Sequence, residues 1–330
     1  MFWKYQPISK GNWNWLKPRP ISFFYLTNHL FPSSTILKIE DIFSKKDEIN
    51  ITMFHKKIEE KNIPSIYFQI EIYNNEEFIG KISYYPTNVF FFKKNKSQKK
   101  IIKQSSYIVE DLFIDEKYRK KKLASFLISC IIQKMQIEKI PYSFFFHDGN
   151  QYSIPYEPFQ HNYLYVYNHE KHIENQNNIF KNTSYIFIKK TFSEKEIVSL
   201  ALKQFTFFHL PIFINPNYLF FYIYEIFGKH KNIRLKCVFY GTYFEEDQIF
   251  TIHGFFGNLK NNITIILQCL HSNNIQKIKK IIHLFPNIPT FYNFFKEPWE
   301  KTQESRKIFA YNMHYNNILS NQSFISSWKD

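Results

Sequence analysis

Apolar and polar residues alternate through residues 63–86 in a way that predicts a β-hairpin. Apolar side chains occupy every second position from Ile66 to Ile72, Asn74-Asn75 can form the turn, and the pattern resumes from Phe78 to Tyr84. A period of two residues places one face of each strand against a core. A third strand is expected over Asn88–Lys93, followed by a solvated loop or hairpin tip in the lysine-rich stretch KKNKSQKK.

The clearest pattern in the chain is a strand followed by a helix. Residues 107–114 form a strand-like apolar stretch, and IPYSFFFHDG (140–149) has the composition of a second, buried strand. Between them, apolar residues recur at spacings of three and four, the period of one helix face. That face comprises Leu123, Phe126, Leu127, Cys130, Ile131 and Met135. Antiparallel strands followed by strand, helix and strand predict a mixed α/β sheet.

A second structural unit is expected after about residue 185, which gives domains at 1–185 and 186–330. Ser193, with Glu196 three residues later, has the spacing of a helix capping box. The remaining expectations are strands at 233–241, 248–256, 262–270 and 307–317, an amphipathic helix at 273–285, a helical stretch at 36–60 and an extended aromatic arm at 1–35.

The charge of the chain narrows the range of partners. Its 330 residues include 43 basic and 28 acidic ones, a formal net charge of +15. Such a surface attracts polyanions: nucleic acid, acidic lipid or phosphorylated small molecules. The alternative is a codon bias that fills the surface with solvated lysines, as the abundance of Phe, Ile, Lys, Asn and Tyr indicates. The sequence has no zinc-finger spacing and no arginine-rich arm, so we expect no specific nucleic-acid partner.

Cysteine usage and hydropathy indicate a cytoplasmic protein. Cys130, Cys237 and Cys269 are far apart and form no C-x-x-C pair, so we expect reduced thiols packed as small apolar groups. The first ten residues have no long apolar core, and the most apolar segment, Tyr218–Phe227, is too short to cross a bilayer. We therefore expect no secretory leader and no integral membrane contact. The stretch His169–His172 lacks the i,i+4 histidine pair of a zinc motif, so no metal site is expected.

Basic residues gather where the strand at 107–114 meets the helix that begins near Leu123. They are Lys117, Arg119, Lys120, Lys121 and Lys122. A helix start has unpaired backbone N–H groups and a partial positive charge, and added cations make it suitable for a phosphate or pyrophosphate. The alternative is a basic helix start on a solvated surface, and the charge pattern alone does not separate the two.

Longer stretches of the sequence resemble a known family. Arg-x-x-x-Leu-Ala at 119–124, after a hydrophobic strand, resembles the acyl-CoA-binding motif of the GNAT acyltransferase superfamily. VEDLFIDEKYRKKKLASFLI (109–128) resembles the matching segment of the N-myristoyltransferases (glycylpeptide N-tetradecanoyltransferases), which also have Lys and Arg in place of glycines. Further segments are similar to that family in the same order along the chain: FWKYQP (Phe2–Pro7), GKISYYPTNV (Gly80–Val89), LKQF (Leu202–Phe205) and TFYNFF (Thr290–Phe295).

The resemblance implies an α/β (α+β) fold of two tandem acyl-CoA N-acyltransferase (GNAT-like) domains with mixed, mostly antiparallel sheets. The first domain would bind acyl-CoA and the second a peptide. The implied reaction is transfer of a myristoyl group from myristoyl-CoA to the amine of an N-terminal glycine. Myristoyl-CoA is then the co-substrate, proteins with an N-terminal glycine are the partners, and no other cofactor is needed. We expect a monomer.

The resemblance also assigns roles to residues of this chain. Two consecutive backbone amides form the family's oxyanion site, here those of Asp111 and Leu112, and its base is the C-terminal carboxylate, here that of Asp330. Glu110 and His147 fall where the family holds the glycine amine. The acyl-CoA contacts fall on Phe2, Trp3, Arg119, Lys120, Lys121, Lys122, Leu123 and Ala124.

Several of these positions depart from the family's pattern. Glu110 replaces an asparagine and could bind an ammonium or act as the base, or it could be a strand-edge residue paired with nearby lysines. His147 could equally be an ordinary loop histidine, and Phe2 and Trp3 ordinary core residues. The tail before Asp330 is polar where the family's is apolar. An α-amine has a pKa of about 7.7 and a C-terminal carboxyl about 3.5, so proton transfer between them costs about 6 kcal/mol in water unless burial shifts both.

Three alternatives to this function stay open. One is a catalytically impaired homologue that binds acyl-CoA or glycine N-termini without turnover. Another is an acyltransferase on the same fold that uses acetyl-CoA or another short acyl-CoA. The last is a basic nucleic-acid-binding protein, for which we expect salt-sensitive binding of DNA or RNA and no affinity for CoA.

Overall fold

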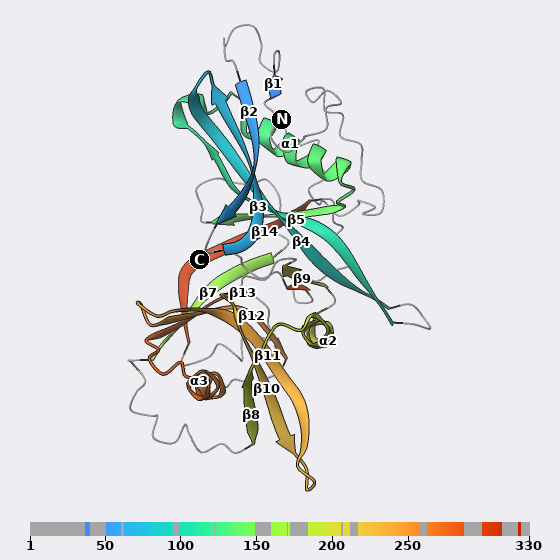
Figure 1. Ribbon diagram of the computed structural model, residues 1–330, viewed down its shortest axis with the longest axis vertical. Helices are drawn as coiled ribbons and strands as arrows, with labels where there is room; N and C mark the ends of the chain where they lie inside the picture. Colours follow the sequence, from blue (N-terminus) through green and yellow to red (C-terminus); the bar gives the residue numbers. More distant parts are fainter. Residues whose placement is uncertain are drawn as a thin grey trace.

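The computed structural model describes residues 37–39, 51–60, 63–94, 99–121, 123–148, 160–169, 171, 184–205, 207–211, 217–257, 263–286, 299–311 and 323–324. Figure 1 shows two lobes, one built by the first half of the chain and one by the second, with strands of both halves passing between them. The predicted arm at 1–35 lies outside the described residues.

The first half consists of antiparallel strands followed by a strand–helix–strand unit. Its elements are β1 (Leu37–Ile39), β2 (Ile51–Glu60), β3 (Ile63–Asn74), β4 (Glu77–Lys94), β5 (Lys99–Ile114), the short 3-10 helix η2 (Glu116–Tyr118), α1 (Leu123–Ile137) and β6 (Tyr142–Asp148). The predicted hairpin is confirmed as β3–β4, with its turn at Asn75, whose φ of 57° is left-handed. The strand expected at 88–93 is the continuation of β4, and Lys94 pairs with Lys99 across the predicted hairpin tip.

The elements of the second half are β7 (Gln160–Asn168), β8 (Tyr185–Lys189), α2 (Glu194–Gln204), β9 (Phe207–Pro211), β10 (Leu219–Phe227), β11 (Asn232–Phe244), β12 (Ile249–Gly257), α3 (Ile263–Ser272), β13 (Lys280–Pro286), β14 (Glu300–Tyr311) and β15 (Ser323–Phe324). Part of the second half, β10 to β13, has the same order of antiparallel strands followed by strand, helix and strand. The predicted cap is present, because Ser193 Oγ accepts a hydrogen bond from the Glu196 amide at 3.4 Å. No helix within the described ranges is both long and apolar enough to span a bilayer.

The strands form one continuous path in the order β1-β2-β3-β4-β5-β6-β14-β7-β13-β12-β11-β10-β8. Along this path only β5/β6 and β12/β13 are parallel, and each of these pairs encloses a helix in the sequence, α1 and α3 respectively. The mixed, mostly antiparallel α/β architecture is therefore confirmed. The halves interlock, since β14 lies between β6 and β7 and β9 pairs with β4. The boundary at 185/186 stays a prediction.

Three secondary-structure predictions were wrong. Residues 51–60, expected to be helical, form β2, because Met53 enters the core while the strand pairs with β3 along its whole length. The segment 262–270, predicted to be a strand, lies mostly in α3, and the segment 273–285, predicted to be a helix, contains most of β13. The β-branched residues of α3 favour a strand, but seven of the ten side chains of this helix are buried, and tertiary packing outweighs propensity.

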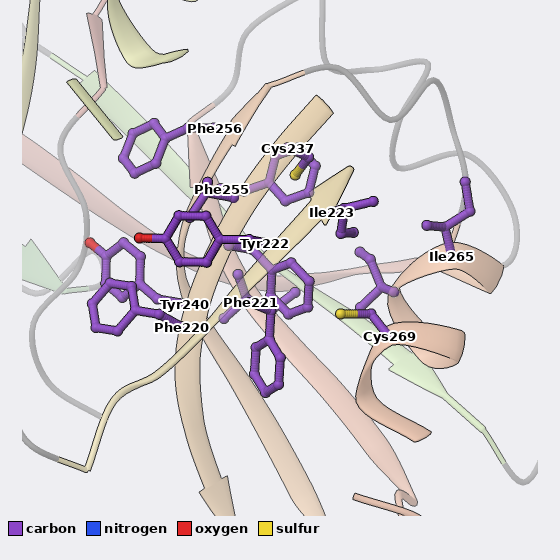
Figure 2. Close-up of a cluster of buried hydrophobic side chains, with 14 of the residues drawn as sticks. Phe220, Phe221, Tyr222, Ile223, Cys237, Tyr240, Phe255, Phe256, Ile265 and Cys269 are labelled. Carbon is purple, nitrogen blue, oxygen red and sulfur yellow. The ribbon is translucent and has the colours of Figure 1, made fainter. Parts of the chain in front are cut away.

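Two aromatic-rich cores support the sheets. In the first, α1 packs on β2–β4 with the predicted apolar face, since Leu123, Phe126, Leu127, Cys130, Ile131 and Met135 are all buried. In the second, shown in Figure 2, rings from neighbouring strands stack, such as Phe220 on Tyr240 at 5.0 Å between centroids. The free thiols Cys130, Cys237 and Cys269 are buried in these cores, as expected for small apolar groups.

Two buried histidines of the second core make stability depend on pH. His283 Nδ1 donates to the Ile252 carbonyl at 2.6 Å, and His253 Nε2 lies 2.8 Å from Thr242 Oγ1. Burial lowers the pKa of His253 to about 4. Burial, assisted by the nearby His253, lowers the pKa of His283 to about 3. Both rings are therefore neutral in the folded protein at pH values where the unfolded chain already binds protons.

We expect the free energy of unfolding to fall as the pH decreases from about 6.5 towards 4, by up to about 1.4 kcal/mol per pH unit for each histidine. Above about pH 6.5 the two histidines no longer lower the free energy of unfolding, because they bind no proton in either the folded or the unfolded state. Urea unfolding at a series of pH values measures this slope. His283→Asn keeps a donor near the Ile252 carbonyl and should reduce the slope, whereas the exposed His230→Gln should not. Equal slopes in all three proteins would contradict this assignment.

Candidate functional site

A β-bulge in β5 falls on the two residues predicted to form the oxyanion site. Ser83 of β4 pairs with Glu110 and Lys81 pairs with Phe113, so Asp111 and Leu112 together face a single residue of β4. An extra residue of this kind is left outside the ladder and bends the strand. Asp111 has a φ of 53°, in the left-handed region. Among residues with a Cβ, Asp and Asn adopt this region most readily, which gives a physical reason for Asp at this position.

Strands β5 and β6 separate at the same level as this bulge. Their parallel pairing runs from Ser106 and Tyr142 to Val109 and Phe145 and ends there, although both strands continue. Beyond Phe145, the pairing partner of β6 among the described residues is β14, which lies along the other edge of β6. The bulged backbone therefore lies where the pairing of β5 with β6 has ended, a place that we call the opening between these strands. Leu112 is 45% exposed.

Gly80 allows β4 to approach the end of β5 closely. A Cβ at this position would lie 2.7 Å from both Ile114 Cδ1 and the Phe113 carbonyl oxygen. Gly80 pairs with Ile114, directly beyond the bulge, and the Asp115 amide donates to the Ile79 carbonyl at 2.9 Å. The close contact fixes the direction in which the chain leaves β5 and enters the basic loop.

The basic loop is built around one buried aromatic residue, Tyr118. Its hydroxyl donates to Glu77 Oε2 at 2.7 Å and accepts from Asn74 Nδ2 at 3.2 Å. Asp115 caps η2 by accepting from the Lys117 amide at 3.1 Å. The Nζ atoms of Lys117 and Lys121 lie 5.2 and 5.6 Å from the centre of the Tyr118 ring. Tyr118 was not among the predicted site residues, because its only signal in the sequence is a single aromatic residue within a charged run.

The cations of the loop have different environments. Lys117 pairs with Glu77, whose pKa is lowered by hydrogen bonds from Lys117 and Tyr118. Arg119 donates to the Ile114 carbonyl at 3.3 Å and to Glu116 at 3.1 Å, but both members of that ion pair are exposed, so the pair is weak and exchangeable. Lys120 is exposed and has a φ of 66°, a conformation that glycine would adopt without strain.

The loop leads directly into α1. Leu123 begins the helix and is buried, Ala124 is half-buried, and Lys121 is partly exposed. The structure thus places cations in front of a helix whose first side chain anchors it in the core. The structure does not describe Lys122.

A row of polar residues crosses the strands next to the bulge. Gln69, Ser83 and Glu110 lie directly opposite one another on β3, β4 and β5. Gln69 Nε2 donates to Ser83 Oγ at 3.2 Å, and both residues are buried. Because its oxygen accepts this bond, the hydroxyl of Ser83 can donate its proton elsewhere. Glu110 is half-buried. Its neighbours Gln69 and Ser83 were not predicted, because no sequence pattern connects them with Glu110.

The other predicted site residues are only partly placed. His147 lies near the end of β6, half-buried, on the strand that separates from the bulged β5. The structure therefore places Glu110, Asp111 and Leu112 on β5 and His147 on β6, the two strands that separate here. Phe2, Trp3 and Asp330 lie outside the described residues.

Comparison with known proteins agrees with this geometry. Residues 34–157 match the model of the acetyltransferase (GNAT) family, a segment that contains the bulge, the basic loop and α1. The match covers less than half of the chain. A comparison with curated proteins gave no match.

Solved structures of Saccharomyces cerevisiae N-myristoyltransferase are similar over nearly the whole chain. One with bound myristoyl-CoA is 11% identical, with a TM-score of 0.51 over 94% of this chain and 92% of that chain. A second is 12% identical, with a TM-score of 0.52 over 94% and 88%. A third, with myristoyl-CoA and inhibitors, is 11% identical, with a TM-score of 0.52 over 94% and 89%. The predicted tandem GNAT-like fold is confirmed, and so is the structural resemblance to N-myristoyltransferases.

Gly80→Ala tests the close contact beside the bulge. The added methyl group overlaps the Phe113 carbonyl oxygen, so we expect a loss of about 1–3 kcal/mol in the free energy of unfolding. Urea denaturation measures it. Lys81→Ala, on the adjacent half-buried residue, is the control and should change stability much less. If the two variants are equally stable, β4 and β5 do not approach each other as described.

Proposed function

We propose that this protein is an N-myristoyltransferase, which transfers myristoyl from myristoyl-CoA to the amine of an N-terminal glycine and acts as a monomer in the cytoplasm. The observation that carries the proposal is the bulge at Asp111 and Leu112, beside the opening between β5 and β6 and just before the basic loop. Acyl transfer from CoA needs an oxyanion site next to a phosphate site, and in this proposal the bulge would supply the first and the basic loop the second. The GNAT match over residues 34–157 supports the acyltransferase class.

The basic loop would bind the phosphates of CoA. Lys120 and Lys121 have no ion-pair partner within the described residues, and the exposed pair of Arg119 with Glu116 can be exchanged for a phosphate. Lys122 would add charge, and Leu123 and Ala124 would hold the helix start in place. Phe2 and Trp3 would pack over the CoA, as the resemblance implies.

The reaction joins the amine nitrogen to the thioester carbonyl carbon and breaks the carbon–sulfur bond. In the tetrahedral intermediate the carbonyl oxygen carries negative charge, which the amides of Asp111 and Leu112 would stabilise, each by about 3 kcal/mol. The amine loses a proton to a base, and the CoA thiolate leaves and takes up a proton. Asp111 is exposed, so its carboxylate can remain in water, away from the oxyanion.

Two carboxylates are candidates for the base. The resemblance assigns the role to the α-carboxylate of Asp330. Glu110 is the second candidate, since it directly precedes the bulge and its Oε1 atom is buried there. His147, across the opening, would contact the incoming amine.

One assay separates the proposal from its alternatives. The purified protein is incubated with labelled myristoyl-CoA or acetyl-CoA and a peptide that begins Gly-Ser. We expect transfer of myristoyl to the glycine. Deletion of Asp330 should abolish it if the terminal carboxylate is the base, whereas Glu110→Gln should do so if Glu110 is. Transfer of acetyl alone identifies a short-chain acyltransferase, and binding without transfer identifies an impaired homologue.

The basic loop makes a separate prediction about binding. Lys120→Gln combined with Lys121→Gln should weaken myristoyl-CoA binding by about tenfold, since two charge-assisted contacts are lost. Isothermal titration measures the dissociation constant, and the difference should shrink at high salt. Lys229→Gln with Lys231→Gln, in the exposed turn between β10 and β11, is the matched control. An unchanged dissociation constant in the loop variant would contradict the assignment of this loop to CoA.

A further inference from the structure

A row of basic side chains crosses the middle of the sheet on the far side of the opening. His147 of β6 pairs with Lys307 of β14, and Lys307 pairs with His161 of β7. Directly opposite residues on adjacent strands have their side chains on the same face of a sheet. His147, Lys307 and His161 therefore follow one another on one face.

Two further residues extend this row. The hydroxyl of Tyr163 lies 3.4 Å from His161 Nδ1, and Lys301 Nζ lies 3.3 Å from the centre of the Tyr163 ring. Burial lowers the pKa of His161, and Lys307 and Lys301 lower it further. We call this set the cationic row: His147, His161, Tyr163, Lys301 and Lys307.

The positive charge of the cationic row is not neutralised by the described part of the chain. Among those residues neither Lys301 nor Lys307 has a carboxylate within ion-pair distance, whereas the nearby Glu300 pairs with Lys171 instead. Lys301 is exposed and Lys307 half-buried. Within the same ranges, His147 Nδ1 and His161 Nε2 are buried without a hydrogen-bond partner. Like charges at close range repel, so a bound anion would stabilise this arrangement.

The position of the cationic row indicates which anion it takes. Neighbouring paired strands lie about 4.8 Å apart, so Lys307 and His161 are roughly 5 and 10 Å across the sheet from His147 of β6. An extended peptide advances about 3.3 Å per residue. If its amine lies in the opening, about 3 Å short of His147, and the peptide runs across β6 towards β7, its third to fifth residues pass over Lys307 and His161.

We propose that the cationic row selects acceptor peptides with Asp or Glu at the third to fifth position, whose carboxylate binds beside Lys307 and Lys301. This inference rests on the proposed acyl transfer for the position of the peptide amine. The row gives the enzyme a preference among glycine-starting proteins according to the charge that follows the glycine.

The test compares two peptides that differ only in charge, one with Asp and Glu at positions 3–5 and one with Asn and Gln. Their binding is measured by fluorescence anisotropy on protein saturated with a non-hydrolysable myristoyl-CoA analogue, and their acylation as kcat/KM. We expect the acidic peptide to bind about five- to tenfold more tightly. Lys307→Gln should remove most of this preference and Lys301→Gln part of it, while the remote Lys229→Gln leaves it unchanged.

The outcomes separate this inference from the proposed function. Transfer to both peptides with equal kcat/KM and equal affinity would overturn the inference and leave the function standing. A preference that depends on Lys307, without any transfer, would support the inference and overturn the function. The inference would also be overturned if Lys307→Gln lost affinity equally for both peptides, or if this variant weakened only the binding of myristoyl-CoA. It would be overturned as well if the unchanged protein bound neither peptide.

Discussion

Strand β14 hydrogen-bonds β6 along one edge and β7 along the other, so a segment near the end of the sequence joins strands from both halves into a single sheet. Without it, β6 has only its short parallel pairing with β5, and the opening beside the bulge has no fixed second side. The separation of β5 from β6 is thus possible because β6 is held from its other edge. The same strand supplies Lys307 and Lys301, so the element that completes the sheet also contributes charge beside the site.

The candidate site results from a few local departures from regular strand geometry. One extra residue in β5 bends the strand, Gly80 lets β4 follow it closely, and Tyr118 fixes the loop that comes next. None of these features needs a glycine within the loop, since Asp111 and Lys120 adopt left-handed conformations at a cost of about 1–2 kcal/mol each. Such strain persists only where the surroundings over-determine the backbone. Here the surroundings are two cores dense in aromatic rings.

The elements that the sequence predicted correctly are those with an unambiguous period. Alternation through Ile66–Ile72 and the three-four spacing of α1 each reflect burial of one face, so the pattern and the structure agree. Prediction failed for the partly buried β2, for α3, in which seven of ten side chains are buried, and for β13. In α3 and β13 the apolar residues run together, no period distinguishes helix from strand, and the β-branched Ile263–Ile266 favoured the wrong choice.

For the site, the family resemblance located the bulge and the basic loop, because both depend on a contiguous stretch of sequence. It could not locate Gln69, Ser83 or the members of the cationic row other than His147, because these come together only when distant strands are in register. His147, Lys307 and His161 carry no common motif, and no spacing in the sequence connects them. Groups of residues that lie on several strands can be recognised only when the strand order and register are known.

The interlocked halves also constrain how the chain can fold as it is made. β6 emerges from the ribosome roughly 150 residues before β14, a delay on the order of 10–30 s at ordinary rates of translation. During that interval one edge of the N-terminal sheet offers unsatisfied backbone groups to any strand nearby. The sheet of the N-terminal half therefore cannot be completed before β14 has been synthesised. Until then the nascent chain would depend on chaperones, or on rapid pairing of β14 with β6 once it appears, to avoid pairing with other nascent chains on the same polysome.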